Sequence, residues 1–327
     1  MYSAQLLDSF LELSMNSLAV VFERPQELNL RSLPLIAPGD TDVVVDVEWT
    51  GISTGTERLL WSGTMPAFPG MGYPLVPGYE SVGRIAEAGR NSGHTAGDRV
   101  FVAGARCFET AHALFGGAAS RLVVPGTKAI SVEPALEARA TLLALAATAH
   151  HALAGGKGIT PDLIIGHGVL GRLLARLAVL LGDQPVTVWE TNAARRNGAD
   201  GYTVCDPSAD ERRDYKAIYD VSGDSTLLDT LIDRLAPGGE IVLAGFYHEP
   251  LSFRFAPAFQ REARLRVAAE FKAGDLAAVR TLAGNGELSL DGLITHTAAA
   301  PDAPAAYTRA FTDASCVKMV LDWRNCA

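Results

Sequence analysis

The sequence predicts an α/β protein of two domains, a barrel-like β domain followed by a doubly wound parallel sheet. Two observations support this. Residues 17–125 hold short apolar strands broken by Gly and Pro, whereas beyond about residue 135 apolar runs alternate with segments of helical period. A chain of 327 residues is long enough for two domains that each bury a core.

Short strands punctuated by turns characterise the first part. Gly and Pro pairs such as Pro69-Gly70 and Pro77-Gly78 separate the apolar segments and predict irregular connections. The expected strands lie at residues 42–48, 81–85 and 99–102. This spacing is typical of a partly closed barrel.

The second part has the pattern of a parallel sheet covered by helices on both faces. Its runs are apolar throughout rather than alternating, as strands buried on both sides should be. The expected strands are residues 162–165, 186–189, 202–205, 217–221 and 240–244. A helix over 303–311 and a strand over 317–321 then close the chain.

A glycine-rich turn follows the first of these strands. Residues 163–171 read LIIGHGVLG, so the pattern GxGxxG ends a strand and opens a helix. The first glycine permits a tight turn, the second lets the backbone approach a pyrophosphate, and the third lets helix and strand pack closely. The helix N-terminus favours an anion. The candidate cofactor-binding residues are therefore Gly166, Gly168, Val169, Leu170 and Gly171.

Glu190 ends the next expected strand, about 20 residues beyond the glycine turn, where a carboxylate binds the ribose hydroxyls of a dinucleotide. It would repel a 2′-phosphate and so favours NAD over NADP, a preference that the nearby Arg195 and Arg196 would moderate. The alternative is a solvated carboxylate beside a glycine-rich turn in another α/β protein.

Two further strand ends should lie on the same edge of the sheet, where open α/β sheets bind ligands. They add Ser222, Gly223, Ala244 and Gly245 to the cofactor candidates. Ordinary strand-to-helix turns are the alternative.

Composition excludes several classes of function. The net charge is −9 and no basic cluster is apparent, which argues against nucleic acid. No apolar run reaches the roughly 18 residues that span a bilayer.

Residues 1–14 carry acidic residues and no basic segment, so we expect no secretory signal. Either Met1 or Met15 can be the natural start. The four cysteines form no CxxC pair, which favours a reducing cytoplasm.

Four segments together resemble the medium-chain dehydrogenase/reductase superfamily. They are residues 51–57 (GISTGTE), 77–83 (PGYESVG), 97–100 (GDRV) and the turn 166–171 (GHGVLG). The resemblance implies a GroES-like barrel completed by the C-terminal tail, and a Rossmann domain. We expect residues 15–150 and 290–327 in the barrel-like catalytic domain and 151–289 in the Rossmann domain.

The chain departs from the zinc enzymes of this superfamily at their ligand positions. Those enzymes usually have a Cys in the first segment and a His-Glu pair in the second. Here the corresponding residues are Ser53 or Thr54, and Tyr79-Glu80. Catalytic zinc needs three protein ligands, so we expect no metal.

A longer match is more specific. Residues 55–63 (GTERLLWSG) and 65–80 (MPAFPGMGYPLVPGYE) resemble the 3-hydroxyethyl bacteriochlorophyllide a dehydrogenase family. That family oxidises a 3-(1-hydroxyethyl) group on a tetrapyrrole to 3-acetyl, with NAD as acceptor. Two alternatives stay open: a zinc-free quinone or enoyl reductase, and a dinucleotide-binding protein without activity. The oligomeric state is also open, with a homodimer as one option.

Without zinc, hydroxyl side chains have to support the oxidation. The conjugated ring can delocalise positive charge as hydride leaves, so hydrogen bonds from Ser53, Thr56 and Tyr79 can be sufficient. Glu80 or His150 is the candidate proton acceptor. The alternatives are capping by the hydroxyls, packing by the tyrosine, an ion pair between Glu80 and an arginine, and a structural histidine.

A loop rich in Met and aromatic residues provides the candidate substrate wall. Such side chains suit a flat apolar macrocycle, although a loop that merely packs on the barrel would look the same. The candidates are Trp61, Met65, Phe68, Met71 and Tyr73.

Overall fold

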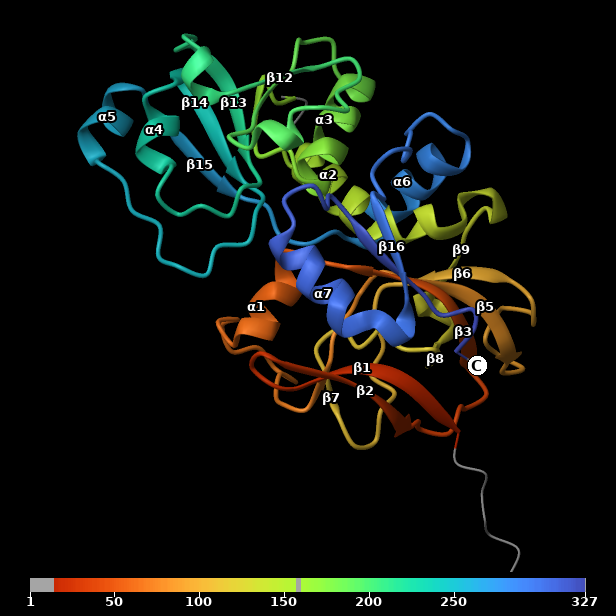
Figure 1. Ribbon diagram of the computed structural model, residues 1–327. Helices are drawn as coiled ribbons and strands as arrows, with labels where there is room; N and C mark the ends of the chain where they lie inside the picture. The colour runs from red at the N-terminus through yellow and green to blue at the C-terminus, as the bar shows by residue number, and fades with distance from the viewer. Residues whose placement is uncertain (1–14, 157–159, 327) are drawn as a thin grey trace, which may run out of the picture.

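A computed structural model describes residues 15–156 and 160–326 and shows two lobes, a barrel and a layered α/β lobe (Figure 1). The expectations about a secretory signal and the natural start concern residues 1–14, which lie outside the described ranges.

The barrel is built from two sheets. In the first, β1 and β2 pair antiparallel and β4 and β7 extend the sheet in the order β2-β1-β4-β7. The second sheet is centred on β3, which pairs with β5, β8 and β17. Their bounds are β1 (Asn16–Arg24), β2 (Glu27–Pro34), β3 (Asp42–Ile52), β4 (Leu75–Val76), β5 (Ser81–Ala88), β6 (Arg99–Val102), β7 (His112–Ala113), β8 (Arg121–Pro125) and β9 (Ala129–Ser131).

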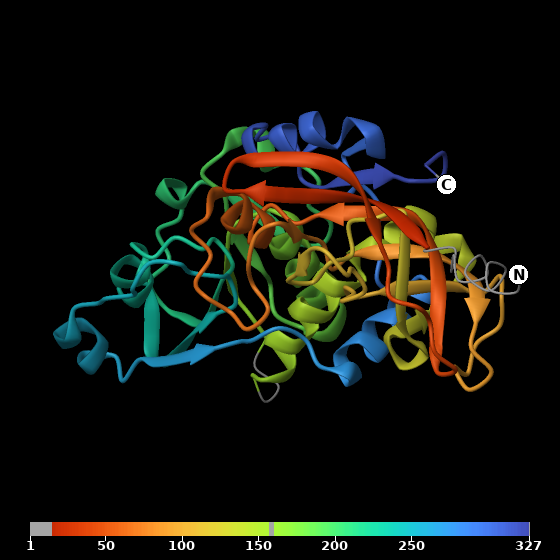
Figure 2. The ribbon, with the colours of Figure 1, turned by 90° about the horizontal axis from the view of Figure 1, so that it is seen from below.

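The C-terminal tail completes the barrel, as expected. It comprises β16 (His296–Ala299), α7 (Ala303–Thr312) and β17 (Met319–Asp322). β17 runs antiparallel to β3 with Met319 opposite Ile52. The edge of the Tyr307 ring on α7 meets the Phe22 ring on β1, with centroids 5.6 Å apart. Figures 1 and 2 show α7 lying along the barrel strands.

The second lobe is a six-stranded parallel sheet in the order β12-β11-β10-β13-β14-β15. This is the doubly wound order, in which the direction of winding reverses between β10 and β13. Its strands are β10 (Leu163–Ile165), β11 (Thr187–Trp189), β12 (Thr203–Cys205), β13 (Tyr215–Asp220), β14 (Leu235–Leu243) and β15 (Arg264–Val267).

Helices cover both faces of this sheet, which explains why its strands are apolar throughout. Ile164 faces a core shared with α2, α3 and α6. Its neighbours Leu163 and Ile165 face a second core shared with α4 and α5. The helices are α2 (Leu143–Ala154), α3 (Val169–Leu181), α4 (Leu228–Ile232), α5 (Phe255–Gln260) and α6 (Ala273–Gly284). The expected domain boundary after residue 150 falls inside α2 and stays a prediction.

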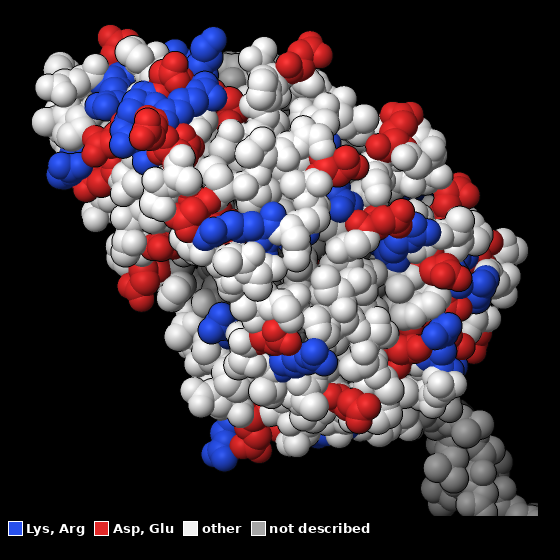
Figure 3. Space-filling view, turned by 45° about the horizontal axis from the view of Figure 1, so that its top comes forward, with Lys and Arg blue, Asp and Glu red and all other residues white. Residues whose placement is uncertain are grey.

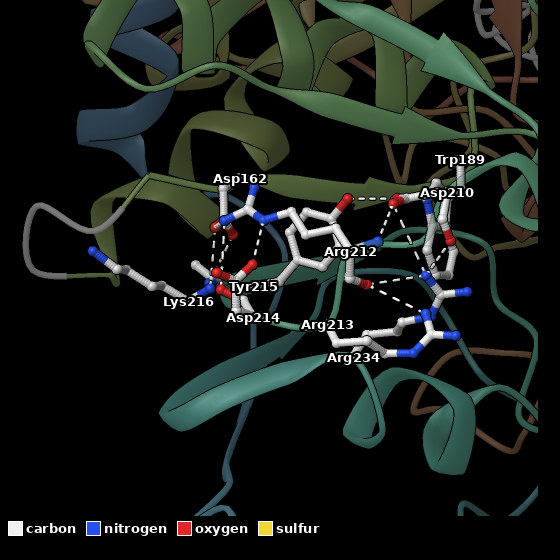
Figure 4. A network of polar contacts seen from close by, with 10 residues as sticks. Asp162, Trp189, Asp210, Arg212, Arg213, Asp214, Tyr215, Lys216 and Arg234 are labelled. Carbon is white, nitrogen blue, oxygen red and sulfur yellow. Dashed lines mark hydrogen bonds and ion pairs between the residues drawn. The ribbon is translucent and has the colours of Figure 1, made fainter.

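A polar network links the residue before β10 and residues of β11 and β13 to the connection between β12 and β13 (Figure 4). The connection from β12 to β13 contains only a short 3₁₀ turn, Pro207–Ala209, in place of an α-helix. Asp210 in this connection accepts hydrogen bonds from Trp189 Nε1 at 2.6 Å and from the Tyr215 hydroxyl. Asp162 accepts from the backbone N–H of Ala217 at 3.0 Å. These carboxylates help to hold the connection in place, as does Arg234, which donates to the Arg212 carbonyl at 3.0 Å.

Surface charge is mixed in sign. On the face drawn in Figure 3, blue and red side chains lie beside one another. Ion pairs such as Arg254–Asp229 and Arg84–Glu48, both at 3.1 Å, join partly exposed side chains of opposite sign. Among residues 15–156 and 160–326, no helix is both long enough and apolar enough to cross a membrane.

Candidate active site

A pair of hydroxyl side chains lies where two barrel strands meet. Ser53 directly follows β3, Tyr79 precedes β5, and their oxygens are 2.7 Å apart. Thr56, the first residue of α1 (Thr56–Ser62), also bonds the Tyr79 hydroxyl through its side chain. Three of the predicted catalytic residues are therefore together.

The environment of Tyr79 keeps its hydroxyl protonated. Burial and then the charge of Glu80 raise the pKa of Tyr79 well above its ordinary 10, and the hydroxyls of Ser53 and Thr56 only partly oppose this. At neutral pH the group is thus a hydrogen-bond donor rather than a base.

Glu80, a predicted catalytic residue, forms a buried ion pair. Its carboxylate meets the Lys318 ammonium just before β17, and both side chains are at most 1 % exposed. A Cβ added at Gly51 would lie 1.9 Å from Glu80 Oε2, so the barrel backbone encloses the pair. An ion pair was the alternative to a catalytic role for Glu80, and its partner is a lysine rather than the expected arginine. Removing either partner would leave an uncompensated buried charge.

A second buried carboxylate, Glu57, was not among the predicted site residues. It is on α1, is fully buried, and accepts the Ser53 backbone N–H at 3.0 Å and the Tyr307 hydroxyl at 2.6 Å. Burial is the main cause that raises the pKa of Glu57 from 4.5 to about 7. Its sequence signal is its place in the segment 51–57 (GISTGTE), which carries the resemblance to the dehydrogenase superfamily.

The glycine turn has the geometry that a pyrophosphate needs. Gly166 adopts φ of +98° and donates its N–H to the Trp189 carbonyl at 2.9 Å. A Cβ at Gly171 would lie 1.9 Å from the Gly166 oxygen, whereas one at Gly168 would meet no atom within 4 Å. Open space therefore faces the N-terminus of α3, where Val169 and Leu170 begin the helix. The turn fits a dinucleotide.

Glu190 lies next to this turn. Its Oε2 accepts the His167 backbone N–H at 3.0 Å and its Oε1 accepts that of Asn192 at 2.8 Å. Each carboxylate oxygen keeps a second lone pair for a ribose hydroxyl. Arg195, a predicted cofactor residue, donates from Nε to the Ala314 carbonyl at 2.6 Å, and Arg196 donates to the Glu190 carbonyl at 2.7 Å.

His167 within the turn is a structural histidine that sequence reasoning did not single out. Its ring nitrogens contact the Arg195 carbonyl at 2.6 Å and the Tyr202 hydroxyl at 2.9 Å. Burial lowers the pKa of His167 from 6.5 to about 4, although the hydrogen bond to Arg195 opposes the shift. The ring is therefore neutral at pH 7 and fastens the turn to the chain after β11.

The two other predicted strand ends meet at the same edge. The Asp220 carbonyl accepts the N–H groups of Ala244 and Gly245, both at 2.9 Å. The Ser222 hydroxyl donates to Asp220 Oδ1 at 2.6 Å, and a Cβ at Gly245 would lie 3.0 Å from the Gly223 nitrogen. These candidates therefore lie beside the switch point between β10 and β13.

The loop after α1 spans the two lobes. Trp61 lies on α1 rather than in the expected loop, and it packs against the barrel core together with Met65, Met71 and Tyr73. Phe68 differs from them because it is 44 % exposed and its ring centroid lies 6.4 Å from that of Phe246. Phe246 follows β14 and Gly245, so an apolar wall reaches the cofactor edge.

Comparison with known proteins identifies the family. Residues 39–134 match the alcohol dehydrogenase GroES-like domain. The chain is 55% identical over 318 residues to the 2-desacetyl-2-hydroxyethyl bacteriochlorophyllide A dehydrogenase of Cereibacter sphaeroides, covering 96% of this chain and 100% of that protein. The chain belongs to this dehydrogenase family. The enzyme of the same name from Rhodobacter capsulatus is also 55% identical, over 95% of this chain and 99% of that one.

Solved structures confirm the medium-chain dehydrogenase fold. The 2R,3R-butanediol dehydrogenase of Bacillus subtilis superposes with a TM-score of 0.81 at 19% identity, covering 94% of this chain and 99% of that chain. Other structures of this fold carry NADP or NADH.

The side chains at the expected zinc-ligand positions have other partners in this chain. Within the described ranges, no group of three or more His, Cys, Asp or Glu side chains is placed to hold an ion. Glu80 is already paired with Lys318. The hydroxyls of Ser53 and Tyr79 bond each other instead.

His150, the remaining predicted catalytic residue, forms its hydrogen bond with a residue that does not belong to the Ser53–Tyr79 pair. Its Nδ1 contacts Asp275 Oδ1 at 2.8 Å, and His151 contacts the other oxygen at the same distance. Asp275 lies in the first turn of α6, so both rings join α2 to α6. A role for His150 as proton acceptor stays a prediction.

Proposed function

We propose that this chain oxidises the 3-(1-hydroxyethyl) group of a bacteriochlorophyllide to a 3-acetyl group, with NAD as acceptor and without catalytic zinc. The observation that carries the proposal is 55% identity to the bacteriochlorophyllide dehydrogenases over nearly the entire chain. The hydroxyl pair of Ser53 and Tyr79, between the end of β3 and the start of β5, supports it.

The cofactor binds along the switch point of the parallel sheet. The open side of Gly168 and the N-terminus of α3 receive the pyrophosphate, and Glu190 receives the adenosine ribose. NAD is favoured over NADP because a 2′-phosphate would meet the Glu190 carboxylate. Bound there, NAD would supply the acceptor for the hydride of the carbinol carbon.

The protein positions the alcohol and receives its proton. Ser53, Thr56 and Tyr79 hydrogen-bond the hydroxyl oxygen of the substrate, which becomes the carbonyl oxygen as the C–H and O–H bonds break. The proton passes to Glu80 or His150, the predicted acceptors. The conjugated macrocycle delocalises the positive charge that develops on the carbinol carbon as hydride leaves. The hydroxyl side chains therefore need to stabilise less negative charge on the substrate oxygen than a zinc ion stabilises in a zinc dehydrogenase.

The apolar wall at Phe68 and Phe246 supports a large flat substrate. Both rings are more than two-fifths exposed although they contact each other, at 44 % and 43 %. Exposed aromatic faces of this kind bind macrocycles through apolar burial. These two rings form the proposed tetrapyrrole side of the site, whereas the predicted residues Trp61, Met65, Met71 and Tyr73 pack against the barrel core.

A direct assay tests the proposal. The purified protein should convert a 3-(1-hydroxyethyl) bacteriochlorophyllide to the acetyl pigment with NAD, more efficiently than with NADP, and should keep that activity in chelator. Elemental analysis should find far less than one zinc per chain. Oxidation that depends on added zinc would refute the zinc-free mechanism, and absence of pigment turnover would refute the substrate.

We also propose a homodimer in the cytoplasm. β15 is an edge strand, and Val267 on it is 76 % exposed. Phe255 and Phe259 on neighbouring α5 are each about 70 % exposed, which is unusual for isolated surface residues. Figure 2 shows this edge facing away from the barrel. Light scattering should report a dimer that Val267→Lys converts to a monomer.

The free thiols of all four cysteines favour a reducing compartment.

A further inference from the structure

We propose that Glu57 is the positioning residue of the Ser53–Tyr79 hydroxyl pair, and that its carboxylate form is the state in which the alcohol is oxidised. This inference rests on the proposed function. It assigns a role to a buried carboxylate that is absent from the predicted catalytic set.

The contacts of Glu57 fix the backbone of Ser53. The Ser53 N–H donates to Glu57 Oε1 at 3.0 Å, and the Glu57 N–H donates back to the Ser53 carbonyl at 3.0 Å. This reciprocal pair closes a ring between residues four apart and fixes Ser53 at the entry to α1. The Ser53 Oγ is thereby directed at the Tyr79 hydroxyl, 2.7 Å away.

The C-terminal tail holds the other side of the carboxylate. Tyr307 on α7 donates to Glu57 Oε2 at 2.6 Å, and the two residues are 250 positions apart in sequence. The Tyr307 ring is itself held edge-on by Phe22 and by Phe311, at 5.6 and 5.7 Å between centroids. Since Glu57 is fully buried, both hydrogen bonds are shielded from water.

The charges around Glu57 determine when it ionises. Glu80 before β5 and Lys318 before β17 act on it in opposite directions, and Tyr307 and Tyr79 face it as neutral hydroxyls. Burial raises its pKa to about 7, while the hydrogen bonds from Tyr307 and Ser53 oppose the shift. The carboxylate therefore forms in the neutral range, and in that form it accepts both the Ser53 N–H and the Tyr307 hydroxyl, which holds Ser53 in place.

The decisive variants are Glu57→Gln and Tyr307→Phe, measured as pH profiles of kcat. The wild type should lose activity about tenfold per pH unit below about 7, as expected for one required ionisation. Glu57→Gln cannot ionise, so it should lose this acidic limb and have kcat at pH 8 lowered about tenfold, with KM for NAD unchanged. Tyr307→Phe removes a bond that favours the anion, so its acidic limb should move to higher pH. Glu87→Gln, at an exposed site on β5, should match the wild type.

Three results would overturn the proposal. The first is an acidic limb that persists in Glu57→Gln, and the second is a limb that does not move in Tyr307→Phe, which applies even if Glu57→Gln fails to fold. The third comes from infrared titration without substrate. The wild type should show a buried carboxyl that ionises in the neutral range and is absent from Glu57→Gln, and a wild type without this signal would overturn the proposal. Without pigment turnover the proposed function fails, while the infrared titration still decides whether Glu57 ionises there.

Discussion

Two glycines of the same turn provide a sharp test of the dinucleotide site. Gly168 has φ of −73° and ψ of −172°, a conformation open to any residue, and an added Cβ would meet nothing within 4 Å. Gly168→Ala should therefore change the free energy of unfolding by less than about 0.5 kcal/mol. It should nevertheless weaken NADH binding at least about tenfold, or about 1.4 kcal/mol, because the methyl group occupies the space of the pyrophosphate.

Gly171→Ala, in contrast, should lower the free energy of unfolding. Its Cβ would lie 1.9 Å from the Gly166 carbonyl oxygen and 3.3 Å from Val221 Cγ2, so α3 must move away from β10. Overpacking of this kind costs about 3 kcal/mol. Thermal unfolding and titration of NADH fluorescence measure both quantities for each variant. NADH binding by a folded Gly168→Ala protein at the affinity of the wild type would refute the assignment of the turn.

Three further outcomes follow from the same structure. Glu190→Ala should weaken NAD binding and narrow the preference for NAD over NADP. It should also lower stability somewhat, because the N–H groups of His167 and Asn192 lose their acceptor. Tighter binding of NADP than of NAD by the wild type would contradict this assignment of Glu190. Phe68→Ala should raise KM for the pigment and leave the Kd of NAD unchanged, and an unchanged pigment KM would place the substrate elsewhere. Because folding raises the pKa of Glu57 from 4.5 to about 7, its contribution to stability is complete below pH 4.5 and is lost as the pH rises through about 7. Urea unfolding should show this loss, of about 3 kcal/mol, in the wild type and its absence in Glu57→Gln.

Local sequence determined those parts of the molecule whose requirements lie within a few residues. The glycines of the turn satisfy steric demands of adjacent backbone: the Gly166 φ of +98° and the close approach of Gly171 to Gly166 both act within six residues. The strands of the parallel sheet were recognisable because both of their faces are buried, as Leu163 and Ile164 show. The hydroxyl residues Ser53 and Tyr79 were likewise predicted as site residues from residue type, and the structure brings them together.

Only the tertiary structure decided how the buried charges are partnered. The register of β17 against β3 brings Lys318 to Glu80, and α7 brings Tyr307 to Glu57 across 250 residues. Asp275 likewise takes both histidines of α2, and Phe246 meets Phe68 across the two lobes. No periodicity or spacing predicts such pairs, because strand register and the docking of the tail set them. The physical reason is that a buried charge needs one specific partner, whereas an apolar strand only needs to be covered.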